Sequence, residues 1–472
     1  MSTVLEIDDL QVESPEAIVR GVSLSIGSGE NLTVLGESGS GKSIMAQAIM
    51  GTLPRDVHAR GSIAVAGMRV LGAGTRSGAQ SAAWGRAMAM LPQEPWLALD
   101  PTMRIGRQVA EVSHYLAGRP WTRARAEAAR LLHEVGLAHA THRHVHQISG
   151  GMAQRAAIAC VRCASPMLLI ADEPTKGLDA TLRDQVADLL RRELAAGKAL
   201  MTITHDVELA RRLGGRIVVM LEGRIVERGP ADSILDHPAH AYSRELVAAA
   251  PGRWPPMALP RPVAAPVVAA QGVAKGYGAE PLFSDVDLAI SRGEIVSVVG
   301  PSGCGKTTLG NIVTGLLAPD RGRVVRQPGL RAHAFQKLYQ DPPASFAPTR
   351  TIGRSLDDLV ALHRLSATAV RQSMLELKLA PALLDRLPSQ VSGGELQRLA
   401  LLRILLLEPD FVFADEPTSR LDPLTQKLTI GLLIRQLAQR GGAMMLVTHD
   451  ADIARSISHR VVDGIFRRLP AG

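Results

Sequence analysis

Short apolar runs alternate with amphipathic segments along the chain, as they do in proteins whose strands and helices follow one another. The runs NLTVL at 31–35 and IVSVV at 295–299 each precede a glycine-rich turn, and an amphipathic stretch at 43–53 follows the first turn. Two further apolar runs, MLLIADE at 167–173 and FVFADE at 411–416, end in Asp and then Glu. Uniformly apolar strands lie in parallel sheets that are buried on both faces. The pattern therefore predicts an α/β fold with a mostly parallel core sheet.

Four motifs occur twice in the same order, which indicates a tandem duplication of a whole domain. They are GESGSGKS at 36–43 and GPSGCGKT at 300–307, ISGGMAQR at 148–155 and VSGGELQR at 391–398, IADEPT at 170–175 and FADEPT at 413–418, and ITHD at 203–206 and VTHD at 447–450. The first pair is 264 residues apart, whereas the others are 243 or 244 apart. We therefore expect about twenty additional residues in the first copy, around Met68–Trp84.

A proline-rich segment separates the two copies. Residues 251–266, PGRWPPMALPRPVAAP, contain six prolines, which cannot form a helix or a central strand. Such a segment is typical of a semi-rigid extended spacer, and at ~3 Å per residue it could reach roughly 50 Å. We therefore predict a first domain at 1–250, a linker at 251–266 and a second domain at 267–472.

Composition and charge narrow the class of protein. A chain of 472 residues is too long for one hydrophobic core, and 46% hydrophobic with 21% charged residues excludes wholesale disorder. Only 14 residues are aromatic, which fits a ligand site built from backbone better than a nucleic-acid surface built on stacking, so we expect no nucleic-acid partner. The net charge of +8 suits an anionic ligand or a membrane surface without deciding between them.

Cellular location is constrained by three features. Three cysteines are too few for a secreted disulfide scaffold, and the N-terminal MSTVLEIDDL carries acids where a signal peptide needs a basic flank. No uncharged apolar run approaches the ~18–20 residues that span a bilayer. We therefore expect a protein of a reducing compartment, whose membrane role depends on partner proteins.

The first motif has the context of a phosphate-binding loop, because a strand precedes it and a helix follows it. Its glycines let backbone N–H groups approach a pyrophosphate, Lys42 and Lys306 supply charge to the β- and γ-phosphates, and Ser43 and Thr307 are candidate Mg²⁺ ligands. The remaining candidate nucleotide-binding residues are Gly36, Glu37, Ser38, Gly39, Ser40, Gly41, Gly300, Pro301, Ser302, Gly303, Cys304, Gly305 and Thr308. The alternative, a merely structural glycine turn, does not explain why the full context occurs twice.

The acidic pairs at the ends of the apolar runs complete this chemistry. The carboxyl ends of parallel strands are where open α/β sheets place their ligands. Asp172 and Asp415 can then hold Mg²⁺ through water, and Glu173 and Glu416 can orient a water molecule or act as its general base. The alternative, that these acids are solvated strand ends, is disfavoured by their pairing with the phosphate loops.

Together the phosphate loop, SGGxxxR, (I/F)ADEPT and (I/V)THD resemble the motifs of ATP-binding cassette (ABC) ATPases, here with two cassettes fused. The resemblance covers nearly the whole chain. It implies two tandem P-loop NTPase domains, each adding an antiparallel β subdomain and a helical subdomain, at roughly 94–148 and 341–391, to the parallel core. It implies that ATP is the nucleotide and that the two cassettes pair within the chain, each ATP lying between one phosphate loop and the other cassette's SGG residues. Those residues are Ser149, Gly150 and Gly151 in the first copy and Ser392, Gly393 and Gly394 in the second.

Further residues take their roles from the same resemblance. His205 and His449 match the switch histidines that contact the γ-phosphate, and Gln93 and Gln340 match the glutamine loop that reaches the metal and the attacking water. Tyr277 stands where the family stacks an aromatic ring under adenine. The first copy has LQVESPEA at 10–17 and no aromatic residue there, so we expect looser nucleotide binding at its site.

The loop sequences resemble one branch of the family. Residues 97–112, 344–359 and 237–251 are similar to segments of dipeptide, oligopeptide and nickel importers. The resemblance implies a peripheral ATPase at the cytoplasmic face of the inner membrane, two membrane-spanning permease subunits and an extracytoplasmic solute-binding protein. The solute would be a peptide, nickel or a metal chelate. A non-transport twin-cassette ATPase, for example one serving phosphonate breakdown, and an exporter remain open alternatives.

Several other features have ordinary and functional interpretations. Lys176 and Arg420 stand beside Asp179 and Asp422 where small residues are common, which leaves communication between the cassettes open. Because both copies keep their Lys, Asp, Glu and His, we predict that both hydrolyse ATP.

Cys160 and Cys163 form a C-x-x-C pair without a second pair, so core packing is favoured over a metal site. The histidines at 142, 144 and 146 fit a solvated loop, with metal binding as the alternative, and the Arg-rich segment 119–136 fits a helix with an Ala/Leu core face, with lipid contact as the alternative.

Overall fold

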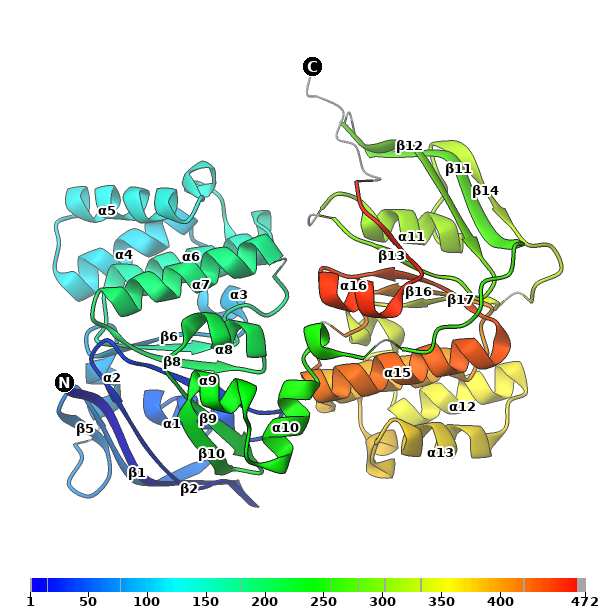
Figure 1. Cartoon of the computed structure of the whole chain (residues 1–472). Helices are drawn as coiled ribbons and strands as arrows, with labels where there is room; N and C mark the ends of the chain where they lie inside the picture. The colour runs from blue at the N-terminus through cyan, green and yellow to red at the C-terminus, as the bar shows by residue number, and fades with distance from the viewer. Residues whose placement is uncertain are drawn as a thin grey trace. The chain divides into compact units, whose positions relative to one another are not determined.

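The computed structural model of the chain describes residues 2–14, 16–76, 78–178, 180–255, 257–278, 280–300, 303–331, 333–418 and 421–464. The chain divides into two compact units, Met1–Ala248 and Ala249–Gly472 (Figure 1). Each unit contains one largely or wholly parallel sheet and one antiparallel sheet, joined by helices. This architecture confirms the predicted α/β fold class.

The first unit contains a six-stranded core sheet in the order β10-β9-β3-β8-β7-β6. Its strands are β3 (Asn31–Leu35), β6 (Met88–Leu91), β7 (Leu168–Asp172), β8 (Ala199–Thr204), β9 (Arg216–Leu221) and β10 (Arg224–Pro230). All neighbours are parallel except β9 and β10. The antiparallel sheet has the order β2-β1-β4-β5, from β1 (Thr3–Ser14), β2 (Glu16–Gly27), β4 (His58–Val65) and β5 (Met68–Leu71).

The second unit repeats this plan with fewer strands. Its parallel core sheet has the order β15-β16-β17-β13-β18, from β13 (Ile295–Val298), β15 (Phe335–Leu338), β16 (Phe411–Asp415), β17 (Ala443–Val447) and β18 (Arg460–Val462). Its antiparallel sheet has the order β12-β11-β14, from β11 (Pro266–Tyr277), β12 (Glu280–Ser291) and β14 (Arg321–Arg326). The extra residues of the first unit form β5 and α2 (Ala79–Ala83), whereas 327–334 join β14 to β15 in the second.

The central strands are apolar throughout because both of their faces are buried. In β7, Leu168 and Ile170 join the cluster formed with α1 (Lys42–Met50) and the antiparallel sheet, whereas Leu169 and Ala171 join the cluster formed with the helices on the other side. In β16, residues 411–414 alternate between two clusters in the same way. The period of two along each strand thus explains a run that has no polar position before its final acid.

The remaining helices of the first unit are α3 (Pro95–Ala98), α4 (Ile105–Ala117), α5 (Trp121–Glu134), α6 (Gly150–Ala164), α7 (Ala180–Ala195), α8 (Val207–Leu213), α9 (Ala231–Asp236) and α10 (Ala241–Ala248), with single 3₁₀ turns η1 (Ala138–Ala140) and η2 (Val145–Gln147). Those of the second unit are α11 (Lys306–Thr314), α12 (Ile352–His363), α13 (Ala367–Glu376), α14 (Gly393–Leu405), α15 (Pro423–Arg440) and α16 (Ala451–Ile457), with η3 (Pro251–Arg253), η4 (Pro342–Ser345), η5 (Pro381–Asp385) and η6 (Pro388–Gln390). The segments from α3 to η2 and from η4 to η6 are the two helical subdomains. In α5, Ala124, Ala128, Leu131 and Leu132 are buried, which confirms the predicted core face.

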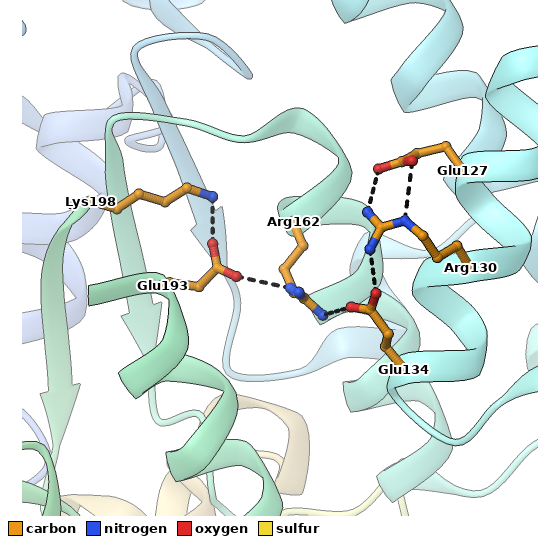
Figure 2. A network of polar contacts seen from close by, with 6 residues as sticks. All are labelled: Glu127, Arg130, Glu134, Arg162, Glu193 and Lys198. Carbon is orange, nitrogen blue, oxygen red and sulfur yellow. Dashed lines mark hydrogen bonds and ion pairs between the residues drawn. The ribbon is translucent and has the colours of Figure 1, made fainter. Parts of the chain in front are cut away.

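A network of charged side chains joins the first helical subdomain to its core (Figure 2). Arg162 of α6 lies between Glu134 of α5 and Glu193 of α7, with its Nη1 2.9 Å from Glu134 Oε2 and its Nε 2.9 Å from Glu193 Oε1. Lys198, just before β8, also pairs with Glu193, and Arg130 pairs with Glu134. Because the Arg162 and Glu193 side chains are only 15% and 9% exposed, this network is shielded from water more than a surface ion pair.

The proline-rich segment differs from the extended spacer that we expected. Trp254 is 7% exposed within a core cluster of the second unit, and Met257 and Leu259 pack against that cluster. Its backbone also makes hydrogen bonds to the second unit. The carbonyl oxygen of Pro260 lies 2.8 Å from His459 Nε2, and Val263 N–H donates to the carbonyl oxygen of Arg292 at 2.8 Å. Burial of these apolar side chains outweighs the extended preference of prolines, so the segment runs along the second unit instead of spanning open solvent.

Candidate nucleotide-binding sites

The phosphate loop of the first unit is the turn at 36–41 between β3 and α1. Gly41 has a φ of 96°, and a Cβ there would lie 2.8 Å from the Ile18 carbonyl oxygen, so only glycine fits. The Lys42 ammonium donates to the carbonyl oxygens of Gly36 at 2.9 Å and Glu37 at 2.7 Å, and to Ser40 Oγ at 3.2 Å. The loop thus folds back over its own lysine, whose side chain is almost wholly buried.

The second phosphate loop has the same design between β13 and α11. Gly305 has a φ of 107°, and a Cβ there would lie 2.7 Å from the Phe283 ring. The Lys306 ammonium donates to the Gly300 carbonyl oxygen at 2.8 Å and lies 4.0 Å from Cys304 Sγ. The loop residues Gly303 and Thr308 are described, whereas the candidates Pro301 and Ser302 lie outside the described residues.

A hydroxyl and a buried carboxylate meet beside each loop. Ser43 Oγ donates to Asp172 Oδ1 at 3.3 Å, and Thr307 Oγ1 donates to Asp415 Oδ1 at 3.1 Å. The two aspartates are only 3% and 2% exposed. Burial raises the pKa of Asp172 to about 6, and it also raises the pKa of Asp415. Mg²⁺ prefers hard oxygen ligands of these two kinds, so the residues present fit a magnesium ion.

Each candidate catalytic glutamate contacts its histidine. Glu173 Oε1 lies 2.7 Å from His205 Nδ1, and Thr204 Oγ1 donates to Glu173 Oε2 at 3.3 Å. In the second unit, His449 Nδ1 lies 3.4 Å from Glu416 Oε2. Burial acts to raise the pKa of both glutamates. The neighbouring histidine and the phosphate-loop lysine of each unit together outweigh burial and hold both pKa values below the usual range. Both glutamates are thus kept ionised, as a base or water-orienting group requires.

The backbone holds both glutamates in an uncommon conformation. Glu173 and Glu416 have φ values of 48° and 47°, in the left-handed region that residues other than glycine seldom adopt. Their N–H groups donate to the carbonyl oxygens of Ile203 at 2.8 Å and Val447 at 2.9 Å, which fixes the turn at the end of each strand. Strain of this kind concentrates at functional sites, where the surrounding fold maintains it.

The glutamine loops follow β6 and β15, but they differ between the units. Gln340 Nε2 donates to Glu416 Oε2 at 3.0 Å. Within the described part of the chain, the Gln93 amide forms no corresponding bond with Glu173. The structure therefore brings the second glutamine into its site more closely than the first.

The two SGG motifs begin helices. Ser149 Oγ accepts a hydrogen bond from Met152 N–H at 3.4 Å and caps α6. Ser392 Oγ accepts from Glu395 N–H at 3.4 Å and caps α14, and Glu395 completes the capping box by accepting from Ser392. The glycines 150–151 and 393–394 therefore lie in the first turns of two long helices, where free N–H groups favour an anion.

Comparison with known protein families shows which family the chain belongs to. A family model described as ABC transporter matches residues 19–176 and again 283–419, more than half of the chain. The chain belongs to the ABC transporter family. Each matched segment begins in the antiparallel sheet and extends past the acidic pair, so this ABC protein carries two cassettes and is an ATPase of the predicted kind.

Curated relatives of this ABC ATPase match both cassettes together. The peptidoglycan transport ATP-binding protein YejF of Agrobacterium fabrum is 33% identical, over 97% of this chain and 90% of that protein. The glutathione import ATP-binding protein GsiA of Escherichia coli is also 33% identical, over 97% of this chain and 83% of that protein. Among solved structures, an RNase-L inhibitor superposes with a TM-score of 0.65 at 19% identity, over 96% of this chain and 87% of that one. The last likeness shows the fold alone.

Two residues near the sites escaped the sequence analysis. Tyr242 of α10 accepts a hydrogen bond at 2.8 Å from the N–H of Glu37 in the first phosphate loop, although its segment served above only as a mark of the importer branch. Lys337 of β15 lies 3.6 Å from Asp415 Oδ2. Burial lowers the pKa of Lys337, and Asp415 acts in the opposite direction. A lysine within a short core strand was the available signal for Lys337.

The structure also places the predicted adenine-stacking tyrosine and one of the aspartates expected to link the cassettes. Tyr277 is 60% exposed at the end of β11, so its ring is accessible for stacking. Asp422 caps α15 by accepting from Thr425 N–H at 3.0 Å, whereas Asp179 and Arg420 lie outside the described residues.

The cysteine and histidine features show no metal cluster. Cys163 belongs to a core cluster and Cys160 packs against it, which confirms core packing. In the ranges that the structure describes, no three His, Cys, Asp or Glu side chains come together as a metal site, the histidines at 142–146 included. In the same ranges, no helix is both long and apolar enough to cross a membrane.

Proposed function

We propose that this ABC ATPase powers an importer for peptide-type solutes. The observation that carries the proposal is the match of 97% of the chain to two relatives whose names describe glutathione import and peptidoglycan transport. Neither name refers to nickel or to a metal chelate, so a peptide-containing solute is the better supported cargo. The likeness to the RNase-L inhibitor does not favour a non-transport role, because at 19% identity it concerns the fold alone.

Each cassette would bind ATP through its phosphate loop. The Lys42 and Lys306 ammonium groups donate to loop carbonyl oxygens, and phosphate oxygens of ATP would replace some of these acceptors. Ser43 with Asp172, and Thr307 with Asp415, would hold Mg²⁺, with Gln93 and Gln340 reaching the same region. Bound Mg²⁺ neutralises charge on the phosphates during phosphoryl transfer. Tyr277 would stack under adenine in the second cassette only.

Hydrolysis would depend on the two glutamate–histidine pairs. Glu173 and Glu416 would orient the attacking water and accept its proton, and both are kept ionised by their histidines and phosphate-loop lysines. His205 and His449 would contact the γ-phosphate. The presence or loss of that phosphate would then change the contact between each histidine and its glutamate. This change is a local switch of the kind that a γ-phosphate controls in other nucleotide-dependent proteins.

The two cassettes would close around shared nucleotides. The first phosphate loop would be completed by Ser392, Gly393 and Gly394, and the second by Ser149, Gly150 and Gly151. The capping of α6 and α14 by their serines supports this role, because it leaves glycine N–H groups at the helix start for a γ-phosphate. The helical subdomains would pass the closure to two membrane-spanning subunits at the cytoplasmic face of the inner membrane, and an extracytoplasmic binding protein would deliver the solute.

Reconstitution tests the proposal. The chain is co-expressed with a candidate permease pair of a peptide importer, and the complex is placed in proteoliposomes. ATP hydrolysis is then measured with the matching binding protein, with and without peptide. We expect the chain to co-purify with the membrane and its ATP hydrolysis to rise with the loaded binding protein. A Glu173→Gln, Glu416→Gln control should still co-purify with the membrane but show no stimulated hydrolysis. A chain that stays in the soluble fraction, or hydrolysis that ignores the binding protein, would contradict the importer and favour a non-transport ATPase or an exporter.

A further inference from the structure

A buried lysine places a positively charged side chain beside the candidate magnesium ligand of the second site. The Lys337 ammonium lies 3.6 Å from Asp415 Oδ2, and the lysine side chain is only 9% exposed. Its Nζ donates to Asn311 Oδ1 at 2.9 Å and lies 5.2 Å from the centre of the Phe413 ring. Contacts from α11 and β16 thus fix the ammonium beside the candidate metal ligand.

The first unit carries no charge at the corresponding place. Met90 pairs with Ile170 across β6 and β7, as Lys337 pairs with Phe413 across β15 and β16. Met90 packs against the apolar core cluster that contains Ile170. The two strands have the same position and register in their sheets. The presence of Lys in the second unit and Met in the first is therefore a local difference between two otherwise similar candidate magnesium sites.

The two oxygens of Asp415 have different neighbours. Oδ1 accepts a hydrogen bond from Thr307 Oγ1 at 3.1 Å, on the side where the hydroxyl and the carboxylate would hold the metal, whereas Oδ2 faces Lys337. The lysine therefore partly neutralises the carboxylate without occupying the metal-facing side. A nearby positive charge also repels a divalent cation directly.

We propose that Lys337 weakens Mg²⁺ binding at the second site, so that the two sites of one chain depend unequally on Mg²⁺. The inference rests on the proposed magnesium sites. A unit charge near a divalent ion, screened roughly as in bulk water, changes metal affinity by about tenfold. Lys337 is thus a positioning residue that tunes Asp415.

The experiment measures nucleotide binding instead of turnover. Affinity for a fluorescent ATP analogue is measured in Mg²⁺ and in EDTA, and the ratio of the two affinities reports the contribution of the metal. A Lys42→Ala background reports the second site alone, and a Lys306→Ala background reports the first. Lys337→Met and Met90→Lys exchange the two residues, and Lys337→Arg is the charge-conserving control.

We expect Lys337→Met to raise the metal ratio of the second site by about tenfold, Met90→Lys to lower that of the first by a similar factor, and Lys337→Arg to leave the ratio near the unmodified value. A structural role would change both affinities equally and leave the ratio constant, which would overturn the inference. If Lys337→Met fails to fold, Met90→Lys still decides the question. If neither unmodified site shows a metal effect, the magnesium sites themselves are wrong and the inference falls with them.

Discussion

Adding one methyl group at Gly310 should destabilise the second unit and leave the first unchanged. Gly310 lies in α11, and a Cβ at this position would be 2.1–2.4 Å from three atoms of the Phe413 ring. Phe413 is wholly buried in β16, so its ring cannot move into solvent. Alanine would therefore push α11 away from β16, the two elements that carry Thr307 and Asp415.

The magnitude follows from two opposing effects. Overpacking a filled core costs ~1–3 kcal/mol, and the severity of this overlap places Gly310→Ala near the upper limit. Alanine in a helix interior returns about 1 kcal/mol relative to glycine. We therefore expect a net loss of roughly 2 kcal/mol in the free energy of unfolding of the second unit.

The first unit supplies the compensating change. At the matching places of α1 and β7 it has Ala46 and Ile170, a larger helix residue and a smaller strand residue of the same core cluster. The double variant Gly310→Ala, Phe413→Ile copies this pair into the second unit. It should recover at least half of the loss, because coupled core residues compensate one another.

The assay must separate the two units, since a chain with two domains does not unfold in one step. Hydrogen exchange of peptides from α11 and α1, followed by mass spectrometry through a urea series, reports each unit separately. A Gly310→Ala chain that is as stable as the unmodified one, or a double variant no better than the single one, would refute this account of the packing.

Three further predictions concern other parts of the chain. Iodoacetamide at neutral pH should label Cys304 in the phosphate loop before Cys160, because burial raises the pKa of Cys160 to about 12. ATP should slow the labelling of Cys304. Peptide mapping that finds equal labelling rates for the two cysteines would contradict this. Arg162→Leu, which introduces the residue found at 405, should destabilise the first unit by about 1–2 kcal/mol. It removes the cation that lies between Glu134 and the buried Glu193 and leaves each carboxylate with one remaining cationic partner. Unchanged exchange in α5 would count against it. Tyr242→Phe should cost about 1 kcal/mol and increase exchange at the Glu37 amide, while unchanged protection there would exclude the hydrogen bond.

Local sequence patterns predicted the parts of the fold that local chemistry determines. Apolar runs ending in Asp and Glu placed β7 and β16, and glycine-rich turns before amphipathic stretches placed α1 and α11. The repeat spacing placed the extra elements of the first unit. These features were accessible because strand burial and phosphate-loop geometry each restrict residue types over a few neighbouring positions.

Contacts between segments far apart in the sequence could not be predicted from local patterns. The bond of Tyr242 to the first phosphate loop joins residues 205 apart, and the contact of Lys337 with Asp415 joins two neighbouring strands through their register. The burial of Trp254 depends on a core that the proline count does not reveal. The left-handed backbone at Glu173 and Glu416 arises from a strand-end turn that the sequence alone does not mark.

The central claim is that each nucleotide is shared between the two cassettes, and a single-site chain tests it most directly. In a Glu416→Gln chain, the proposed roles leave only the site of Lys42 and Glu173 to hydrolyse ATP. The account predicts that Gly393→Glu abolishes this hydrolysis, because a bulky acid would meet the γ-phosphate bound to the first loop, whereas the matched change Gly150→Glu spares most of it. Hydrolysis that survives Gly393→Glu and is lost with Gly150→Glu would contradict the shared sites.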